Sequence, residues 1–213
     1  MANFDKTYWD KNYSDPQSMD GIGNAKDHVR YLASFFEVEQ VDVSSIVDLG
    51  FGYGYLFKQM LKTFIPHTAL GIEPSTHAFK KVKLEKLRPV PSTDLELLPL
   101  DLLSWCRTKR SKTFDLGICT SVFQYLSDAE LKEIIPVLSR RIKYLYLTVP
   151  TDVELQRQIE ELEFKDEYAI HRTRKRYHTL LSANFTFISS RILESKHFFN
   201  EETTPFTDLL YRY

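Results

Sequence analysis

The chain has 213 residues, 43% of them hydrophobic and 14% aromatic, which is enough for the core of one compact α/β domain with an N-terminal addition. Its formal net charge of -1 excludes a global electrostatic bias toward nucleic acid or an anionic membrane. The two cysteines have no disulfide or metal-ligand spacing, no apolar run approaches membrane-spanning length, and the first residues lack the regions of a signal peptide, so we expect a cytoplasmic protein.

The first half of the chain alternates between helical and strand periodicity. Val29, Leu32 and Phe36 share one face of a helix expected over residues 24–36. The next elements are expected as a strand ending at Asp48, a helix over 56–64, a strand ending at Glu73, a helix from the N-cap Ser75 toward Arg88, and a strand over 95–100.

The second half continues the alternation and ends in two strands. Ser127-x-x-Glu130 and Thr151-x-x-Glu154 are capping boxes, which mark helix starts. Because a short Ser, Asn, Glu and Pro-rich loop joins the last two strands, they are expected to be antiparallel. The expected elements are strand 114–119, a helix from Ser127 to Leu138, strand 142–149, helices over 151–162 and 171–183, and strands 185–193 and 206–211.

A glycine-rich turn follows the first strand. The run from Ile46 to Leu56 begins apolar, breaks into alternating glycines and resumes as a helix. Gly50 and Gly52 can take positive φ and lack a Cβ, so a ligand can approach the main chain and the helix N-terminus. The next strand ends on Glu73, a suitable acceptor for ribose hydroxyls. Together these features predict a site for a nucleoside-bearing cofactor.

Two residues indicate which nucleoside is bound. Tyr55 stands where a dinucleotide fingerprint needs a small residue, because there the helix must close against a pyrophosphate. Asp48 would repel a pyrophosphate but would tolerate a ligand with a positive group. A nicotinamide-dependent dehydrogenase is therefore a weaker alternative.

The motifs at residues 46–54 and 71–75 resemble those of the class I S-adenosylmethionine-dependent methyltransferases. The resemblance continues at 100–102, 114–118 and 144–149. It implies an α/β fold with a seven-stranded, mostly parallel, doubly wound sheet, an antiparallel C-terminal hairpin strand, helices on both faces and an N-terminal helical cap. We expect one domain over 1–213, with a cap or lid segment at 1–40, the cofactor-binding core at 41–150, and substrate-side helices and C-terminal strands at 151–213.

The resemblance also implies the cofactor and its site. The cofactor would be S-adenosyl-L-methionine, with S-adenosyl-L-homocysteine as the product and no metal. Asp101 would accept a hydrogen bond from the adenine amino group, with Leu102 beside the ring; a helix N-cap acid and a ligand-free glycine turn are the structural alternatives. Asp115 would be a structural acid. The cofactor-binding residues would be Asp48, Gly50, Phe51, Gly52, Gly54, Glu73, Pro74, Ser75, Asp101, Leu102 and Ser121.

Methyl transfer needs mainly alignment and exclusion of water, so no acid and base pair need be visible. The end of the fourth strand, residues 120–125, would face the methyl group and places Gln124 and Tyr125 at the reaction centre. It lacks the Asn/Asp-Pro-Pro-Tyr signature of enzymes that methylate nucleobase amino groups, which disfavours DNA. His171 is the candidate base, with an ordinary surface histidine as the alternative.

Substrate-binding candidates come from both ends of the chain. Tyr8, Trp9 and Tyr13 would cover the cofactor and acceptor, although aromatic residues more commonly pack onto a core. Arg172 belongs to the basic run 171–178 and would bind an anionic acceptor, unless this run is only a solvated helix face.

The sequence therefore predicts a cytoplasmic methyltransferase, monomeric or homodimeric, that acts on a small-molecule acceptor and binds neither DNA nor a membrane. One alternative is a protein or RNA acceptor, which the basic run would serve. Another is a non-catalytic module that binds S-adenosylmethionine or a partner without turnover.

Overall fold

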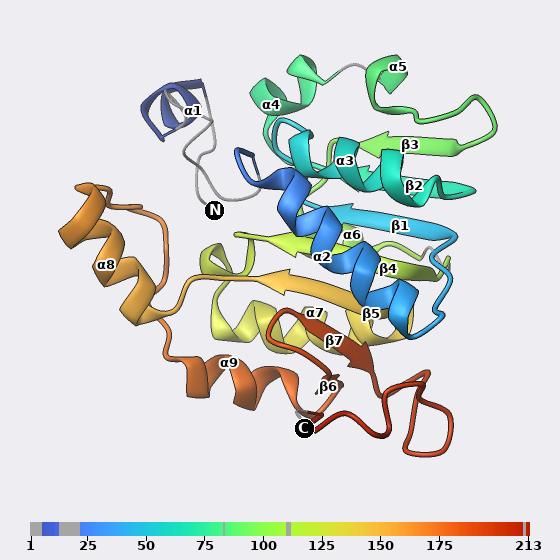
Figure 1. Ribbon diagram of the computed structural model, residues 1–213. Helices are drawn as coiled ribbons and strands as arrows, with labels where there is room; N and C mark the ends of the chain where they lie inside the picture. Colours follow the sequence, from blue (N-terminus) through green and yellow to red (C-terminus); the bar gives the residue numbers. More distant parts are fainter. Residues whose placement is uncertain (1–5, 13–21, 83, 110–111, 211) are drawn as a thin grey trace. The chain divides into compact units, whose positions relative to one another are not determined.

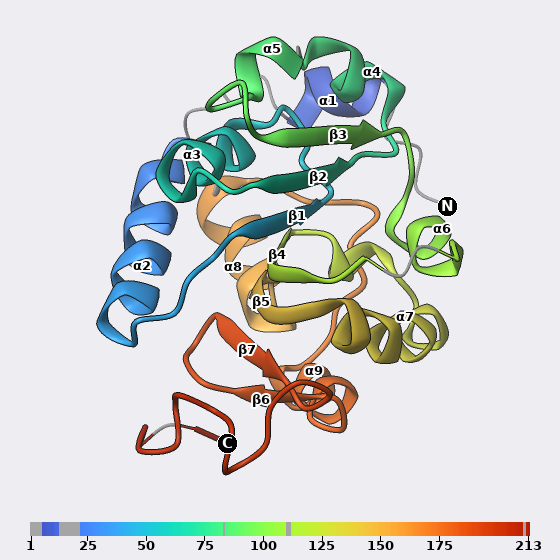
Figure 2. The ribbon, with the colours of Figure 1, turned by 90° about the vertical axis from the view of Figure 1, so that its right-hand side faces the viewer.

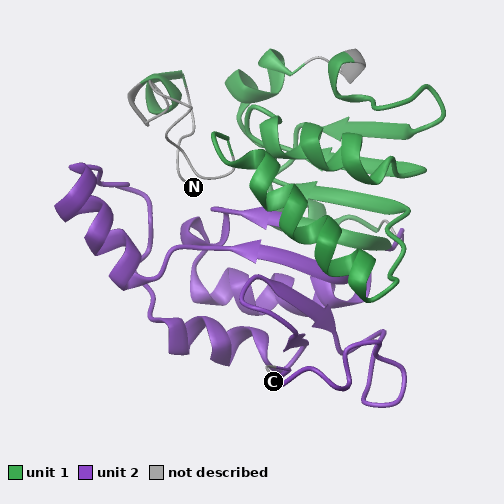
Figure 3. Ribbon diagram, in the orientation of Figure 1, with its two compact units in different colours: residues 1, 3–110, 114–118 green, residues 2, 111–113, 119–213 purple. Residues whose placement is uncertain are grey.

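The structure, a computed structural model, describes residues 6–12, 22–82, 84–109, 112–210 and 212–213. Its strands form a seven-stranded, mostly parallel sheet in the order β3-β2-β1-β4-β5-β7-β6, with helices around it (Figure 1). The chain divides into two compact units, residues 3–110 with 114–118 and residues 111–113 with 119–213 (Figure 3). None of the described helices is both long and apolar enough to cross a membrane.

Unit 1 is built on parallel strands. β1 pairs with β2 and with β4, and β2 pairs with β3, in a register that sets Asp48 beside Gly71. Helices α2 and α3 lie on one face of these strands and α6 on the other (Figure 2). The elements are α1 Lys6–Asn12, α2 Ala25–Val38, β1 Ser45–Leu49, α3 Tyr55–Phe64, β2 Thr68–Ile72, α4 Thr76–Lys81, α5 Leu84–Leu87, β3 Asp94–Leu98, α6 Leu102–Arg107 and β4 Phe114–Thr120.

Gly71 and Asp115 have structural roles in the sheet of unit 1. A Cβ at Gly71 would lie 2.8–2.9 Å from side-chain atoms of Phe51, Phe57 and Leu97, so β2 has no room for a side chain there. Asp115 accepts hydrogen bonds through Oδ2 from the backbone N–H and hydroxyl groups of Ser44 and Ser45. It ties β4 to the start of β1, as expected of a structural acid.

Unit 2 combines an antiparallel edge with three helices. β7 pairs antiparallel with β5 and with β6. Both predicted capping boxes are present, Ser127 with Glu130 at α7 and Thr151 with Glu154 at α8. The elements are the 3₁₀ turn Phe123–Tyr125, α7 Asp128–Arg141, β5 Ile142–Thr148, α8 Asp152–Leu162, α9 Arg174–Leu181, β6 Phe185–Phe187 and β7 Ile192–Ser195.

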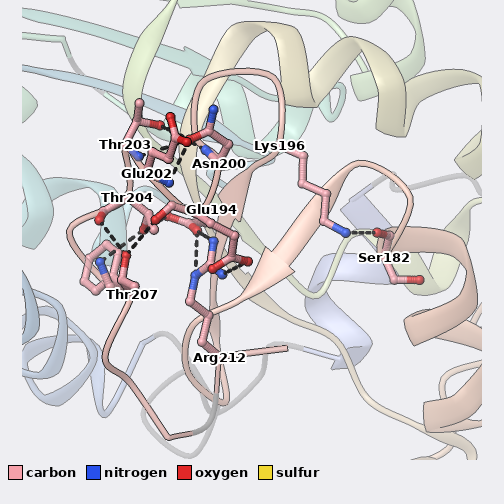
Figure 4. A network of polar contacts seen from close by, with 11 residues as sticks. Ser182, Glu194, Lys196, Asn200, Glu202, Thr203, Thr204, Thr207 and Arg212 are labelled. Atoms are coloured by element: carbon pink, nitrogen blue, oxygen red, sulfur yellow. Dashed lines mark hydrogen bonds and ion pairs between the residues drawn. The ribbon is translucent and has the colours of Figure 1, made fainter.

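A buried carboxylate on β7 anchors the C-terminal segment. Glu194, 1% exposed, accepts hydrogen bonds from Arg212 at 2.7 and 3.1 Å and from the Thr204 hydroxyl at 2.7 Å (Figure 4). Arg212 also pairs with Glu201 at 2.6 Å. Because burying an unpaired carboxylate is costly, these contacts hold Thr204 and Arg212 against β7.

Four predicted elements differ in the structure. The helix expected from Ser75 toward Arg88 ends at Lys81, because Val82 is extended, and a separate short helix, α5, follows at Leu84–Leu87. The helix expected from His171 begins at Arg174, because Thr173 is its N-cap and accepts a hydrogen bond from the Arg176 N–H.

The two C-terminal strands were also wrongly placed. Residues 185–193 are not one strand, because the Ser189 hydroxyl accepts hydrogen bonds from Arg191 N and Ile192 N and turns the chain into the β6–β7 hairpin. Residues 206–210 are not a strand; it is Tyr213 that exchanges two backbone hydrogen bonds with Phe187 of β6.

Candidate functional site

The glycine loop between β1 and α3 has the conformation that its sequence predicts. Gly50, Gly52 and Gly54 have φ of 109°, 54° and 75°, values that residues with a Cβ rarely adopt. The N–H groups of Gly50 and Phe51 both donate to Ile72 O at the end of β2. The loop is therefore held between the carboxyl ends of β1 and β2, where α/β sheets bind ligands.

Glu73 links the two predicted motifs. The residue is 5% exposed. Its Oε2 accepts a hydrogen bond from Gly52 N and its Oε1 one from Ser75 N, both at 2.8 Å. A carboxylate has about four acceptor positions, so two remain for a ligand. Pro74, which lies between Glu73 and Ser75 in the sequence, is exposed. Ser75 is the N-cap of α4.

Asp48 and Glu73 form a buried acidic pair. Burial raises the pKa of Asp48 well above its usual range, and the nearby charge of Glu73 raises it further. Burial also raises the pKa of Glu73, against the opposing effect of the hydrogen bonds from Ser75 and Gly52. A ligand that brings positive charge or hydroxyl donors would favour the ionised pair.

The aromatic residues of α1 lie over the same motifs. The Trp9 indole N–H donates to Ser75 Oγ at 2.8 Å, and its ring packs on Tyr53 with centroids 4.5 Å apart. A Cβ on Gly52 would lie 3.3 Å from the Trp9 ring. Tyr8 is 9% exposed and Trp9 6% exposed, in one cluster with Ala78 of α4. Tyr13, predicted to act with them, lies outside the described residues.

Asp101 occupies the position of a helix N-cap. Its Oδ1 accepts a hydrogen bond from Ser104 N at 2.7 Å and its Oδ2 one from the Ser104 hydroxyl at 2.8 Å. The residue is half-buried, and Leu102 beside it is buried. The structural alternative for Asp101 is thus present, and its contact with adenine stays a prediction.

In unit 2 the turn after β4 carries Ser121, a predicted cofactor ligand, and two of the predicted catalytic residues, Gln124 and Tyr125. Ser121 has φ of 55°, which is rare outside glycine, and its N–H donates to Thr148 O at 2.8 Å. Gln124 is 4% exposed, and its Oε1 is buried without a hydrogen-bond partner among the described residues. The Tyr125 hydroxyl donates to Asp166 Oδ2 at 2.6 Å.

Arg172 has protein partners on all three guanidinium nitrogens. Nε donates to Asp128 Oδ1 at 2.6 Å, Nη1 to Phe123 O at 3.2 Å and Nη2 to Leu126 O. The side chain is 4% exposed and lies over the Tyr177 ring at 5.7 Å. Through these contacts Arg172 holds the 3₁₀ turn that carries Gln124. Its predicted binding of an anionic acceptor stays a prediction.

Another residue of the basic run, Arg176, shares the carboxylate that pairs with Arg172. Arg176 also pairs with Asp128, at 2.6 Å, and hydrogen bonds from Arg172 and then Arg176 lower the pKa of that carboxyl. His171 is exposed on the segment before α9. Its role as a base stays a prediction.

Sequence reasoning missed Asp128 and Asp166, the carboxylates that fix the end of β4. Asp128 follows the N-cap Ser127 in the first turn of α7, where an acidic side chain interacts favourably with the helix dipole. That role alone explains an aspartate at this position, so the sequence does not indicate a further partner. Both partners lie about forty residues away along the chain. No local pattern could have paired them.

No protein-family model and no curated protein matches this sequence. Solved methyltransferase structures do match. Magnesium protoporphyrin IX methyltransferase from Synechocystis PCC 6803, with bound S-adenosylhomocysteine, is 16% identical with a TM-score of 0.59, over 89% of this chain and 92% of that chain. N-methyltransferase NodS from Bradyrhizobium japonicum WM9, also with S-adenosylhomocysteine, is 11% identical with a TM-score of 0.60, over 89% and 97%.

A third match is the plantazolicin methyltransferase BamL in complex with a triazolic desmethylPZN analog and S-adenosylhomocysteine. It is 16% identical with a TM-score of 0.60, over 83% of this chain and 65% of that chain. Similarity at these identities shows the fold alone. The chain has the fold of the class I S-adenosylmethionine-dependent methyltransferases.

Proposed function

We propose that this protein is a methyltransferase that binds S-adenosylmethionine in unit 1 and transfers its methyl group to a small-molecule acceptor. When bound, the cofactor would supply a methyl group already activated by a sulfonium leaving group. The protein then has to hold the reactants in line and exclude water.

The observation that carries the proposal is the position of Glu73. One buried carboxylate reaches the glycine loop through Gly52 N and the start of α4 through Ser75 N. It keeps acceptor capacity for two adjacent hydroxyl groups, which a ribose provides. Asp48 adds a second buried carboxyl close to it, and this pair suits a ligand with positive charge and disfavours a pyrophosphate.

The acceptor side has a small number of candidate groups. Gln124 Oε1, buried in the 3₁₀ turn after β4 and without a partner in the described part of the chain, would accept a hydrogen bond from the acceptor. Tyr125 is oriented by Asp166. His171 would be needed only if the acceptor must lose a proton, because a carboxylate or thiolate needs positioning alone.

A small acceptor is favoured over a polyanion. Two of the four arginine and lysine residues of the basic run, Arg172 and Arg176, share Asp128, which leaves only Arg174 and Lys175 as exposed cations of that run. Trp9 covers Gly52 and Ser75, as expected of a site that closes over a small ligand.

The test is a methyl-release screen with labelled S-adenosylmethionine over metabolite, peptide and RNA pools. We expect turnover with a metabolite pool, its loss in Gly52→Val, and its retention in Tyr55→Phe, which changes an exposed residue of α3. Turnover with peptides or RNA alone would replace the small-molecule acceptor. Cofactor binding without turnover in any pool would favour a non-catalytic module.

A further inference from the structure

Three apolar side chains are exposed at the C-terminal end of α8 and on the segment that follows it. Leu162 is 70% exposed, and Tyr168 and Ile170 are each 39% exposed. All three lie within nine residues of one another in unit 2. We propose that this surface, named here the α8 surface, docks a basic and partly apolar segment of a partner protein.

The helix itself gives the first argument. α8 has 11 residues, of which only Leu155 is buried. Helices of this length are marginal without packing, so the capping box and the Gln156–Glu160 hydrogen bond have to support it. Leu155, Ile159 and Leu162 follow helical spacing, and this stripe changes from buried to 70% exposed along its length. Its outer end is an apolar face that the described residues leave uncovered.

The chain after α8 has a defined conformation. Glu163 has φ of 52°, a strained value for a residue with a side chain, and Phe164 N donates to Gln158 O. Asp166 accepts from the Tyr125 hydroxyl, and Ile170 N donates to Gln124 O at 2.8 Å. A surface fixed in this way binds at a lower cost in conformational entropy than a mobile loop.

The acidic side chains around the α8 surface determine which kind of partner segment fits it. Residues 152–168 hold seven carboxylates and only two basic side chains, although the whole chain is almost neutral. Of the cations that follow, Arg172 and Arg176 are paired with Asp128, and Arg174 and Lys175 are exposed on the first turn of α9. This concentration of negative charge opposes nucleic acid and anionic lipid and favours Lys or Arg beside the apolar contacts. The carboxylates are Asp152, Glu154, Glu160, Glu161, Glu163, Asp166 and Glu167.

This inference goes beyond the proposed function, because docking on the α8 surface needs no methyl transfer. A docked segment would nevertheless lie beside the 3₁₀ turn that carries Gln124, since Ile170 is hydrogen-bonded to that residue. Binding of a partner could therefore be coupled to the acceptor side of unit 2.

The test is a fluorescence anisotropy titration with a labelled synthetic peptide of alternating lysine and leucine. A peptide with glutamate in place of lysine is its control. The double variant Leu162→Ser, Ile170→Ser removes two exposed side chains, which should leave the fold intact. Val38→Ser, which changes a residue 76% exposed on α2 of unit 1, is the matched control variant.

We expect the lysine peptide to bind the intact protein, and the double variant to bind it about tenfold more weakly or worse. The Val38→Ser variant should bind the peptide like the unmodified protein. Adding Glu160→Gln and Glu161→Gln to the double variant should weaken its binding of the lysine peptide further. Equal binding of both peptides, an equal loss in Val38→Ser, or binding of anionic vesicles in place of the peptide would overturn the inference. Titration with S-adenosylhomocysteine tests the proposed function separately, since the double variant should retain that affinity.

Discussion

At the scale of single residues, the cofactor side of the proposed site depends on carboxylates that are buried before any ligand is bound. Asp48 is 3% exposed and Glu73 is 5% exposed. Their ionisation costs free energy in the ligand-free protein, because charge is disfavoured in a buried environment. A binding site that tolerates this cost is expected to recover it when a complementary ligand binds.

The raised pKa of Asp48 predicts a pH dependence of stability. The folded state holds the proton more tightly than the unfolded state, so this contribution to stability is complete below about pH 4, the unfolded pKa of an aspartate. It is lost as the pH rises toward the folded pKa. Asp48→Asn should therefore increase the free energy of unfolding at neutral pH, and its advantage over the unmodified protein should grow from about pH 4 upward. Urea unfolding of both proteins across this range measures the difference; an advantage that shrinks with rising pH would show that burial does not control this carboxyl.

The residues that the sequence identified on the cofactor side are those with local signals. Glycines in alternation and an acid at the end of a strand are visible within a few residues, and the structure joins Gly52 to Glu73 as the motif requires. No local pattern of this kind indicates that Arg172 is buried and paired. A basic run reads as a solvated helix face whether or not one of its members is buried, and only the partner Asp128, 44 residues away, distinguishes the two cases.

At the scale of elements, the end of β4 is fixed by contacts from the segment before α9. Arg172 contributes three hydrogen-bonded nitrogens to this junction, and Ile170 N and Asp166 contribute one contact each. These contacts fix the backbone of the 3₁₀ turn that carries Gln124.

Arg172→Ala is therefore expected to act on stability, not on transfer alone. It leaves Leu126 O without this donor, Phe123 O with Leu126 N alone and Asp128 with Arg176 alone, a loss of about 1–3 kcal/mol in the free energy of unfolding. Arg176→Ala, which also removes a partner of Asp128 but changes a side chain 40% exposed, should cost less than about 1 kcal/mol. Chemical denaturation of the two variants compares them; equal small effects would mean that Arg172 is available to a substrate after all.

Helix α1 gives a prediction about dynamics. Trp9 contacts the glycine loop and Ser75, so a ligand held by those groups should change the protection of α1. Hydrogen exchange of residues 6–12 is expected to slow when S-adenosylhomocysteine is added. Deletion of residues 1–18 should lower turnover more than it lowers stability. Equal protection with and without ligand would reduce α1 to a packing element.

The elements that the sequence misplaced are those whose ends depend on side-chain hydrogen bonds. With Thr173 as its N-cap, α9 begins three residues later than the periodicity indicated. The Ser189 hydroxyl turns what the sequence indicates as one long strand into a hairpin. The parallel strands were predicted within one or two residues, because a buried strand carries an apolar run and the glycine and acid motifs mark where it ends.

At the scale of the whole molecule, the fold is shared with methyltransferases whose names specify different acceptors. The fold therefore limits the reaction class but does not choose the substrate. In the proposed function that choice would depend on Gln124 and Tyr125 in the turn after β4, on His171 before α9, and on Trp9 above the glycine loop.

The central claim is that unit 1 binds S-adenosylmethionine through Glu73, and calorimetric titration tests it most directly. The protein should bind S-adenosylhomocysteine and not NAD. Glu73→Ala should weaken binding by about tenfold to a hundredfold, since hydrogen bonds to a charged acceptor are worth about 1.5–3 kcal/mol. Binding of NAD in place of S-adenosylhomocysteine, or an unchanged affinity in Glu73→Ala, would contradict the account.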